Sequence, residues 1–236
     1  MRLRASFFFL ALFTLSASAD DEYRTFTGKD GRTIEARIES ADESTVDIRR
    51  SDGARFTIPK DRLSEKDIEF IDRWIVAEAV GDDRVFKIKA RRRDDNERER
   101  ESASTITEFR DGFYDVHLEN RTGMDLTGLE FWYIMRVERT AQGKQEDRKS
   151  EIWKSGTEKN LSINDREEKE FETNRIELVE TNLKPGWFYI EGGPGKARDK
   201  MDGLYLAVFH EGEVVREYAL PSGILEDGRE KMKTER

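Results

Sequence analysis

Alternating hydrophobic and polar residues dominate the chain between Tyr23 and Pro59. The alternation runs through three stretches, residues 32–39, 44–50 and 54–58. A period of two residues places the apolar side chains on one face of a β-strand. Asp30-Gly31 and Asp52-Gly53 stand between strand segments, and both residue types tolerate the positive φ of tight turns. The pattern therefore predicts a small antiparallel meander.

After this meander the apolar spacing changes to that of a helix. Isoleucines recur every three or four residues, at Ile68, Ile71 and Ile75, and this spacing gathers them on one helical face. Ser64 is a preferred N-cap residue, and Asp67 holds the N3 position of a weak capping box. We expect a helix over residues 65–79 that packs on the meander or leads out of it.

The chain from residue 84 to 222 returns to strand-like patterns. The clearest segments are 85–90, 102–109, 114–118, 129–137, 204–210 and 213–218, with weaker ones near 168–179 and 187–191. Residues 129–137 are apolar on both faces in their middle, which is typical of a central strand. Turn signals stand at Asp111-Gly112 and Glu211-Gly212. Seven to nine short strands with such turns predict a β-sandwich.

Three polar segments interrupt or follow these strands. Residues 91–101 are a dense run of both charge signs, which favours a solvated loop or hairpin tip. Gly192 to Lys196 lacks the spacing of a phosphate-binding loop, and we interpret it as a hairpin loop. Residues 224–236 are mostly charged and are expected to fray.

The N-terminus has the three parts of a secretion signal. Arg2 and Arg4 precede a run of apolar residues from Phe7 to Leu15, and Ala17-Ser18-Ala19 forms a cleavage site. The predicted organisation is a signal peptide at 1–19, a small unit at 20–79, a linker at 80–83, a sandwich at 84–222 and a charged tail at 223–236. The expected location is the periplasm or the extracellular space, without membrane insertion after signal cleavage.

Charge and cysteine content exclude several functions. Acidic residues number 51 against 42 basic ones, for a net charge of −9, and loss of Arg2 and Arg4 makes the mature chain more acidic. Such a chain is a poor partner for nucleic acids and anionic membrane surfaces. There is no cysteine, so disulfides, thiol catalysis and cysteine–metal sites are excluded.

The sequence contains no clear catalytic or metal-binding constellation. His117 lies between Asp115 and Glu119, but a metal site or general base needs further partners that the sequence does not indicate. Trp132, Trp153 and Trp187 form either part of the sandwich core or an aromatic platform for sugars. Trp132 lies in the expected central strand, and we expect it in the core. We therefore expect no enzyme activity, no cofactor and no metal.

The first unit resembles the SLA-one homology domain one, a module first defined in fungal endocytic adaptor proteins. The matching motifs, in order, are Arg24-Thr-Phe26, Gly31-Arg32, Glu35-Ala36, Val46-Asp-Ile-Arg-Arg50, Asp52-Gly53, Phe56-Thr-Ile-Pro59, Leu63-Ser64 and Asp67. Phe26 departs from the family, which usually has Trp there, and we expect this to affect only a surface contact.

The resemblance implies a Src-homology-3-like barrel with one helix that binds Asn-Pro-Phe-x-Asp peptides. The fold class expected for the whole chain is thus mainly β, with this barrel followed by an immunoglobulin/fibronectin-like β-sandwich. A peptide of this kind needs a pocket for its Phe and a cation for its Asp. The candidate binding residues are the cations Arg32, Arg49, Arg50, Arg55 and Lys60, although such charges are often only solvated.

These observations lead to one main functional hypothesis and two alternatives. The main hypothesis is an exported, non-enzymatic adaptor or scaffolding protein whose partner is a protein or peptide of unknown identity. One alternative is a structural envelope or matrix component that self-associates. The other is a carbohydrate-binding accessory protein.

Overall fold

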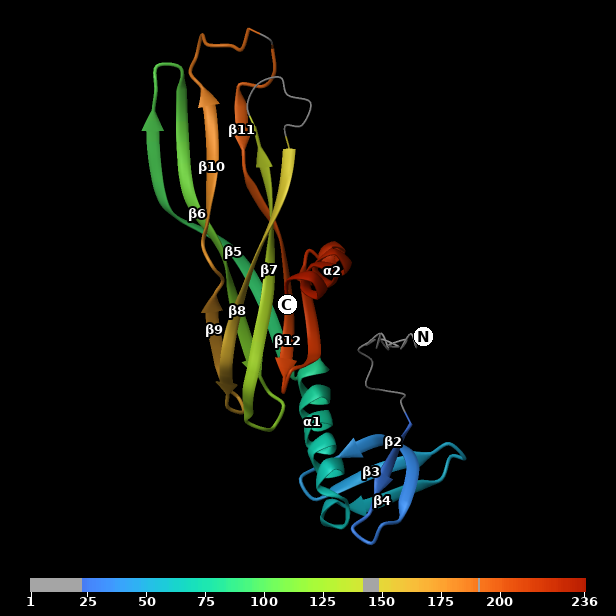
Figure 1. Cartoon of the computed structure of the whole chain (residues 1–236). Helices are drawn as coiled ribbons and strands as arrows, with labels where there is room; N and C mark the ends of the chain where they lie inside the picture. The colour runs from blue at the N-terminus through green and yellow to red at the C-terminus, as the bar shows by residue number, and fades with distance from the viewer. Residues whose placement is uncertain (1–22, 142–148, 191) are drawn as a thin grey trace, which may run out of the picture.

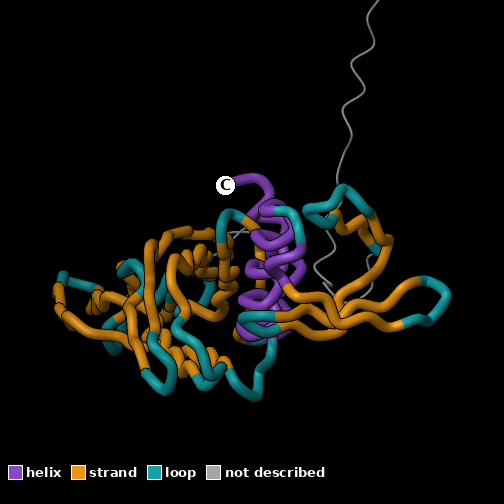
Figure 2. Tube along the Cα trace, turned by 90° about the horizontal axis from the view of Figure 1, so that it is seen from below, coloured by secondary structure: helices purple, strands orange, loops and turns teal. Residues whose placement is uncertain are grey.

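The protein is mainly β, as expected, and its overall shape is elongated (Figure 1). The computed structural model describes residues 23–141, 149–190 and 192–236. The expected signal peptide lies outside the described residues. A small four-stranded unit occupies one end, two long sheets form the rest, and helix α1 (Glu65–Gly81) joins them. Seen from below, α1 lies between the two strand regions (Figure 2).

The small unit forms the predicted meander and helix. Its strands are β1 (Arg24–Thr27), β2 (Thr33–Ala41), β3 (Thr45–Arg50) and β4 (Arg55–Pro59), followed by the short helix η1 (Lys60–Arg62). All neighbours pair antiparallel in the order β1-β2-β3-β4. The local alternation and turn residues thus predicted this region well, because each strand pairs with its neighbour in sequence.

Helix α1 begins as predicted but its capping box is rearranged. The Ser64 side chain accepts a hydrogen bond from the Asp67 backbone N–H at 3.3 Å. The Asp67 carboxylate, only 3% exposed, accepts bonds from Thr27 N at 2.8 Å, Arg24 Nη2 at 2.9 Å and Ser64 Oγ at 2.7 Å. A buried carboxylate is stable when it is paired and hydrogen-bonded in this way. Asp67 therefore ties the start of α1 to β1.

The core of the small unit corrects one expectation about Phe26. Its ring is buried together with Ala36, Val46, Ile48, Leu63 and Ile71. It meets Phe70 edge-on, with ring centroids 6.4 Å apart. The expectation that this departure from the family touches only a surface contact is wrong, because Phe26 belongs to the core.

The joint between the two units is packed, so the expected linker at 80–83 is wrong in its first two residues. Helix α1 continues to Gly81, and Val80 is fully buried in the core of the large unit. Arg216 donates hydrogen bonds to the carbonyls of Val80, at 2.9 Å, and Phe86. Helix α1 therefore connects the two units, and its last turn packs against the sheets of the large unit.

The large unit consists of two antiparallel sheets. Its strands are β5 (Phe86–Glu101), β6 (Thr105–Asn120), β7 (Leu126–Thr140), β8 (Lys149–Ile163), β9 (Glu168–Glu172), β10 (Ile176–Leu183), β11 (Lys196–Arg198), β12 (Lys200–His210) and β13 (Glu213–Leu220). One sheet has the order β11-β10-β6-β5, with β9 also on β6, and the other has the order β13-β12-β7-β8. Buried residues of both sheets share one hydrophobic cluster.

Strand β5 is longer than predicted because the charged run of residues 91–101 is part of it. Residues 91–101 are the second half of β5 and pair with β6. Part of their charge is matched by ion pairs such as Arg93–Asp115 at 2.6 Å and Arg98–Asp111 at 3.2 Å. Strand β5 lies at a sheet edge, where charged side chains are common. The predicted loop there is wrong.

The predicted turn at Asp111-Gly112 is wrong as well, since β6 runs through it. A Cβ on Gly112 would lie 2.6 Å from Leu178 Cδ1 and 2.8 Å from Met201 Cε. Glycine is therefore required here by the close approach of two core side chains and not by a turn. The weak strand predicted at 187–191 is wrong too, because its described residues, 187–190, form a loop and a turn.

The charged tail is folded, contrary to expectation. Residues 225–235 form α2 (Leu225–Glu235), which packs on β12 and β13 after the short helix η2 (Ser222–Ile224). A Cβ on Gly228 would lie 2.3 Å from Tyr205 Cγ, so glycine lets the helix approach the ring. Arg229 pairs with Glu217 at 2.5 Å. Sequence polarity hid this contact because only one face of the short helix is apolar.

Candidate functional site

A hollow of about 510 Å³ lies in the small unit, between the β1–β2 turn and η1. Its floor is apolar, formed by Phe26, Ile34, Ile58 and Leu63, and its rim is charged, formed by Lys29, Asp30, Arg32, Asp61 and Arg62. The β1–β2 turn lies on the side of the small unit that faces away from the large unit (Figure 1, blue). A concave apolar surface with a few polar groups at its edge is the usual form of a binding site.

Backbone hydrogen bonds hold the walls of this hollow. Gly28 N donates to Arg32 O at 2.8 Å and closes the β1–β2 turn, and Lys29 N donates to Arg62 O at 2.8 Å. Gly28 and Leu63 also form an antiparallel bridge. These bonds connect two turns that are distant in sequence, so the hollow is preformed.

The rim carries positive charge that the fold leaves available. Among the described residues, the structure gives Lys29 and Arg62 no ion-pair partner. Arg32 lies 3.6 Å from Asp30 (Nε to Oδ2), but its side chain is 90% exposed, and exposed pairs of this kind contribute little. A ligand that combines an apolar side chain with a carboxylate matches this arrangement.

The fold does not bring the five predicted binding cations together. Arg32 lies at the hollow. Arg49 and Arg55 lie opposite one another on β3 and β4 and share Glu39, at 3.4 and 2.8 Å. Arg50 pairs with Asp52 at the β3–β4 hairpin and stands 5.9 Å from the Phe56 ring.

Lys60 is the fifth predicted cation, and it is buried. Its ammonium group pairs with Asp72 of α1 and donates to Asp42 O at 3.3 Å. Asp72 links the end of β4 to the helix, and Asp42 links it to the turn between β2 and β3. Lys60 thus has a structural position, and its charge is already neutralised.

Sequence reasoning missed Lys29 and Arg62 because they stand in turns. Strand alternation says which face a strand residue occupies, but it says nothing about which turns meet in space. The available signal was local: both residues stand beside motifs that carry the family resemblance, Gly31-Arg32 and Leu63-Ser64. Only the bridge between Gly28 and Leu63 makes them neighbours.

The histidine and the tryptophans make no second site of the kind considered above. The His117 ring lies 3.0 Å from Glu170 and 3.6 Å from Glu168, and no described residues form a group that could hold a metal ion. Trp132 is buried as expected and Trp153 packs against the same cluster. Trp187 lies elsewhere, in the loop between β10 and β11, so no three-tryptophan platform forms.

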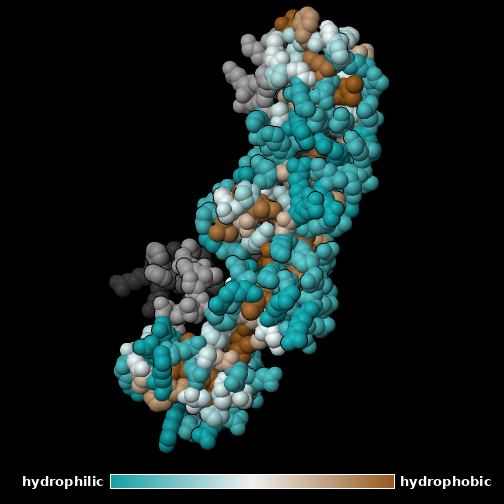
Figure 3. Space-filling model, turned by 180° about the vertical axis from the view of Figure 1, so that it is seen from behind, coloured by the Kyte–Doolittle hydropathy of each residue, from teal (hydrophilic) through white to brown (hydrophobic). Residues whose placement is uncertain are grey.

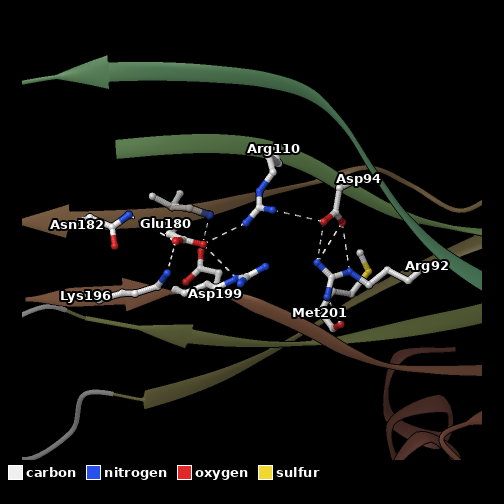
Figure 4. A network of polar contacts seen from close by, with 10 residues as sticks. Arg92, Asp94, Arg110, Glu180, Asn182, Lys196, Asp199 and Met201 are labelled. Carbon is white, nitrogen blue, oxygen red and sulfur yellow. Dashed lines mark hydrogen bonds and ion pairs between the residues drawn. The ribbon is translucent and has the colours of Figure 1, made fainter. Parts of the chain in front are cut away.

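A charged network surrounds the buried Glu180 in the large unit, and two of its cations, Lys196 and Arg198, are about half exposed (Figure 4). Glu180 accepts bonds from Lys196 and from Arg110, at 3.4 Å, and pairs with Arg198 at 3.1 Å. Arg110 also approaches Asp94, at 3.9 Å. The hydrogen bond from Lys196 lowers the pKa of Glu180 although burial opposes the shift. A carboxylate held ionised by three cations is typical of a structural role.

Asp199 extends this network to the other sheet. It pairs with Arg139 of β7 and accepts bonds from Thr140 N at 3.2 Å and from Val179 N at 3.0 Å. Arg92 of β5 reaches across in the same way and donates to Met201 O at 3.2 Å. Hydrogen bonds and ion pairs therefore link the sheets in this region.

The loop between β10 and β11 exposes apolar side chains at the far end of the molecule (Figure 3). Trp187 is 54% exposed, Phe188 80% and Ile190 97%. Soluble proteins seldom leave neighbouring large apolar side chains exposed unless they contact something.

Comparisons with known proteins give no family. No family model and no curated protein matches the chain. One solved structure, an X-ray structure of a Northeast Structural Genomics Consortium target, is 10% identical, with 58% of this chain and 87% of that chain covered and a TM-score of 0.26. A crystal structure from Akkermansia muciniphila is 12% identical, with 57% of this chain and 70% of that chain covered and a TM-score of 0.22. These scores support no structural argument. No helix among the described residues is long and apolar enough to cross a membrane.

Proposed function

We propose that this chain is an exported, non-enzymatic adaptor or scaffolding protein whose small unit binds a peptide segment of a partner. The observation that carries the proposal is the hollow, which combines an apolar floor with cations free of ion pairs among the described residues. Export rests on the sequence of residues 1–19.

The finer architecture belongs to the same proposal. The small unit is a Src-homology-3-like barrel of the SLA-one homology domain one type, and the large unit is an immunoglobulin/fibronectin-like sandwich. The bridge between Gly28 and Leu63 supports the first assignment, because it connects the end of β1 to the segment after β4. The two sheets around one core support the second.

The ligand that suits the hollow carries an aromatic side chain close to a carboxylate. The aromatic ring packs against Ile34 and Ile58, and the carboxylate pairs with Lys29, Arg32 or Arg62 at the rim. The Asn-Pro-Phe-x-Asp peptides implied by the resemblance have this composition. The outer-face pair Arg49 and Arg55 has no such apolar floor and is already engaged with Glu39.

Fluorescence polarisation tests the proposal with a labelled peptide containing Asn-Pro-Phe-Ala-Asp and the chain without residues 1–19. We expect a dissociation constant of roughly 10–100 μM, with binding lost when the peptide Phe is replaced by Ala. Lys29→Glu/Arg62→Glu is expected to weaken binding at least about fivefold, a change of about 1 kcal/mol.

The matched control is Arg49→Glu/Arg55→Glu, which reverses two charges on the outer face of the same unit. It is expected to bind the peptide as the unmodified protein does. Equal weakening by both double variants, or no binding by the unmodified protein, contradicts the proposal.

A further inference from the structure

We infer that the hollow receives the β10–β11 loop of a second copy, so that this chain assembles head to tail. The distal loop is defined here as residues 184–190. The inference rests on the proposed function, because it names the partner of the hollow. The proposed occupant of the hollow is a second copy of this chain.

The distal loop is an apolar projection on a fixed base. Lys184 N donates to Ser104 O at 2.9 Å, and Lys184 Nζ donates to Ser102 O at 2.6 Å. Trp187 N donates to Lys184 O at 3.1 Å and closes a turn. The exposed side chains of Phe188 and Ile190 therefore extend from a held backbone, which limits the ordering cost of binding.

The hollow is the complementary shape. Its volume of about 510 Å³ lies within the range of roughly 300–1,000 Å³ that is usual for ligand pockets. Its floor offers the partly exposed side chains of Ile34 and Ile58 to an entering aromatic side chain. A convex apolar loop and a concave apolar site on the same chain each lack another partner among the described residues.

The charges around the two surfaces are complementary as well. Strand β5 ends beside the distal loop, and Glu101 pairs with Lys184 at 2.7 Å. Of the described residues none forms an ion pair with Glu97 or Glu99 of β5 in this structure. Lys29 and Arg62 at the hollow are also free of ion pairs there. Docking brings Glu97 and Glu99 of one copy to Lys29 and Arg62 of the next.

The two surfaces lie at opposite ends of a stiff molecule (Figure 1). Helix α1 is held to the large unit by Arg216, by buried Val80 and by the ion pair of Arg73 with Glu211 at 3.7 Å. The hollow of a chain therefore cannot reach its own distal loop. A contact between different surfaces of identical subunits leaves one surface of each kind open after two copies have joined, so it adds further copies and gives a ring or an open chain.

A lipid bilayer is the competing occupant of an exposed aromatic loop. The acidic net charge of −9 and the free carboxylates of Glu97 and Glu99 oppose approach to anionic headgroups. The second copy is favoured because it uses both the loop and the hollow. Binding of the chain to lipid vesicles distinguishes a bilayer from a second copy.

Sedimentation velocity of the chain without residues 1–19, from about 10 to 500 μM, tests the inference in the range expected of a small interface. The mass is expected to grow with concentration. The loop variant Phe188→Asp/Ile190→Asp and the hollow variant Lys29→Glu/Arg62→Glu are each expected to stay monomeric. Their mixture is expected to form a discrete species of two chains, because one intact hollow meets one intact loop. Circular dichroism checks that both variants fold.

Three outcomes overturn the inference: a monomer at every concentration, assembly that survives the loop substitutions, or a mixture that forms no two-chain species. Binding of monomers to phosphatidylcholine vesicles through the loop would assign the loop to membranes instead. The peptide titration separates the two proposals. If the peptide binds and the chain stays monomeric, only this inference fails, and if neither occurs, both fail.

Discussion

The two halves of the large unit are held together by different forces. In the half nearer α1, the sheets meet through fully buried residues such as Phe131, Leu118 and Leu206. In the distal half they meet through Arg92, Asp199 and the ion pairs around Glu180 (Figure 4). Gly112, Leu178 and Met201 pack together at the boundary between the apolar half and the charged half.

This difference has consequences for stability and for the distal loop. Apolar burial is non-directional and contributes in proportion to the area removed from water. Buried ion pairs give little net stability, but breaking one leaves an uncompensated charge. The proximal half thus supplies most of the stability, and the distal half keeps a defined geometry that positions the loop.

The largest expected effect is in the apolar half. Phe131→Ala removes a fully buried ring that packs 5.5 Å from Phe171, between ring centroids. We expect a loss of about 3–5 kcal/mol in the free energy of unfolding, measured by urea denaturation. Phe188→Ala is the control, since its side chain is exposed and is expected to change stability by less than about 0.5 kcal/mol. Similar losses in both variants would refute the assignment of the core.

A smaller effect is expected where the two halves meet. Gly112→Ala places a methyl group against Leu178 and Met201, and overpacking of this kind typically costs about 1–3 kcal/mol. Gly223→Ala is the matched control because nothing lies within 4 Å of its added Cβ. Thermal unfolding of both variants measures the difference. If Gly112→Ala leaves stability unchanged, the close approach at this point is incorrect.

The charged half is expected to respond locally. Glu180→Gln leaves Arg110, Lys196 and Arg198 without their shared carboxylate. We expect a loss of about 1–2 kcal/mol, because these cations are partly solvated. Hydrogen exchange should show faster opening of β10 and β11, while β7 and β12 near Phe131 remain protected. Uniform loss of protection would mean that the two halves are not distinct.

Acid is expected to give the smallest change, and it acts through the same residue. The bond from Lys196 lowers the folded-state pKa of Glu180 from an ordinary value of 4.5. Its contribution to stability is complete above the unfolded pKa and is lost as pH falls through the folded pKa. Unfolding free energies at pH 6.5 and pH 3.5 should therefore differ more for the unmodified protein than for Glu180→Gln. An equal pH dependence in both would exclude this role of Glu180.

The small unit and the large unit also differ in how far sequence reasoning reached. Strands β2, β3 and β4, the Ser64 cap and helix α1 were predicted because their partners are near in sequence. The hollow was only partly predicted: Arg32 was identified, but Lys29 and Arg62 were not. Their proximity depends on the contact between the turn after β1 and the segment after β4.

The large unit was predicted in class but not in detail. Trp132 and the strand at 129–137 were identified as core, since a doubly apolar strand needs cover on both faces. The charged half of β5 and helix α2 were missed. Charge predicts solvent exposure only when no partner is in reach, and here Asp111, Asp115 and Glu217 provide that partner from other strands.

The sequence by itself determined the mainly β class, the meander with its capped helix, and the acidic, cysteine-free chemistry of the chain. These follow from local periodicity, turn residues and composition. Tertiary structure alone decided that turns 28–32 and 61–63 enclose a hollow, that charges join the distal sheets, and that Gly112 and Gly228 permit close packing. Each of these depends on contacts between distant segments, which no local pattern specifies.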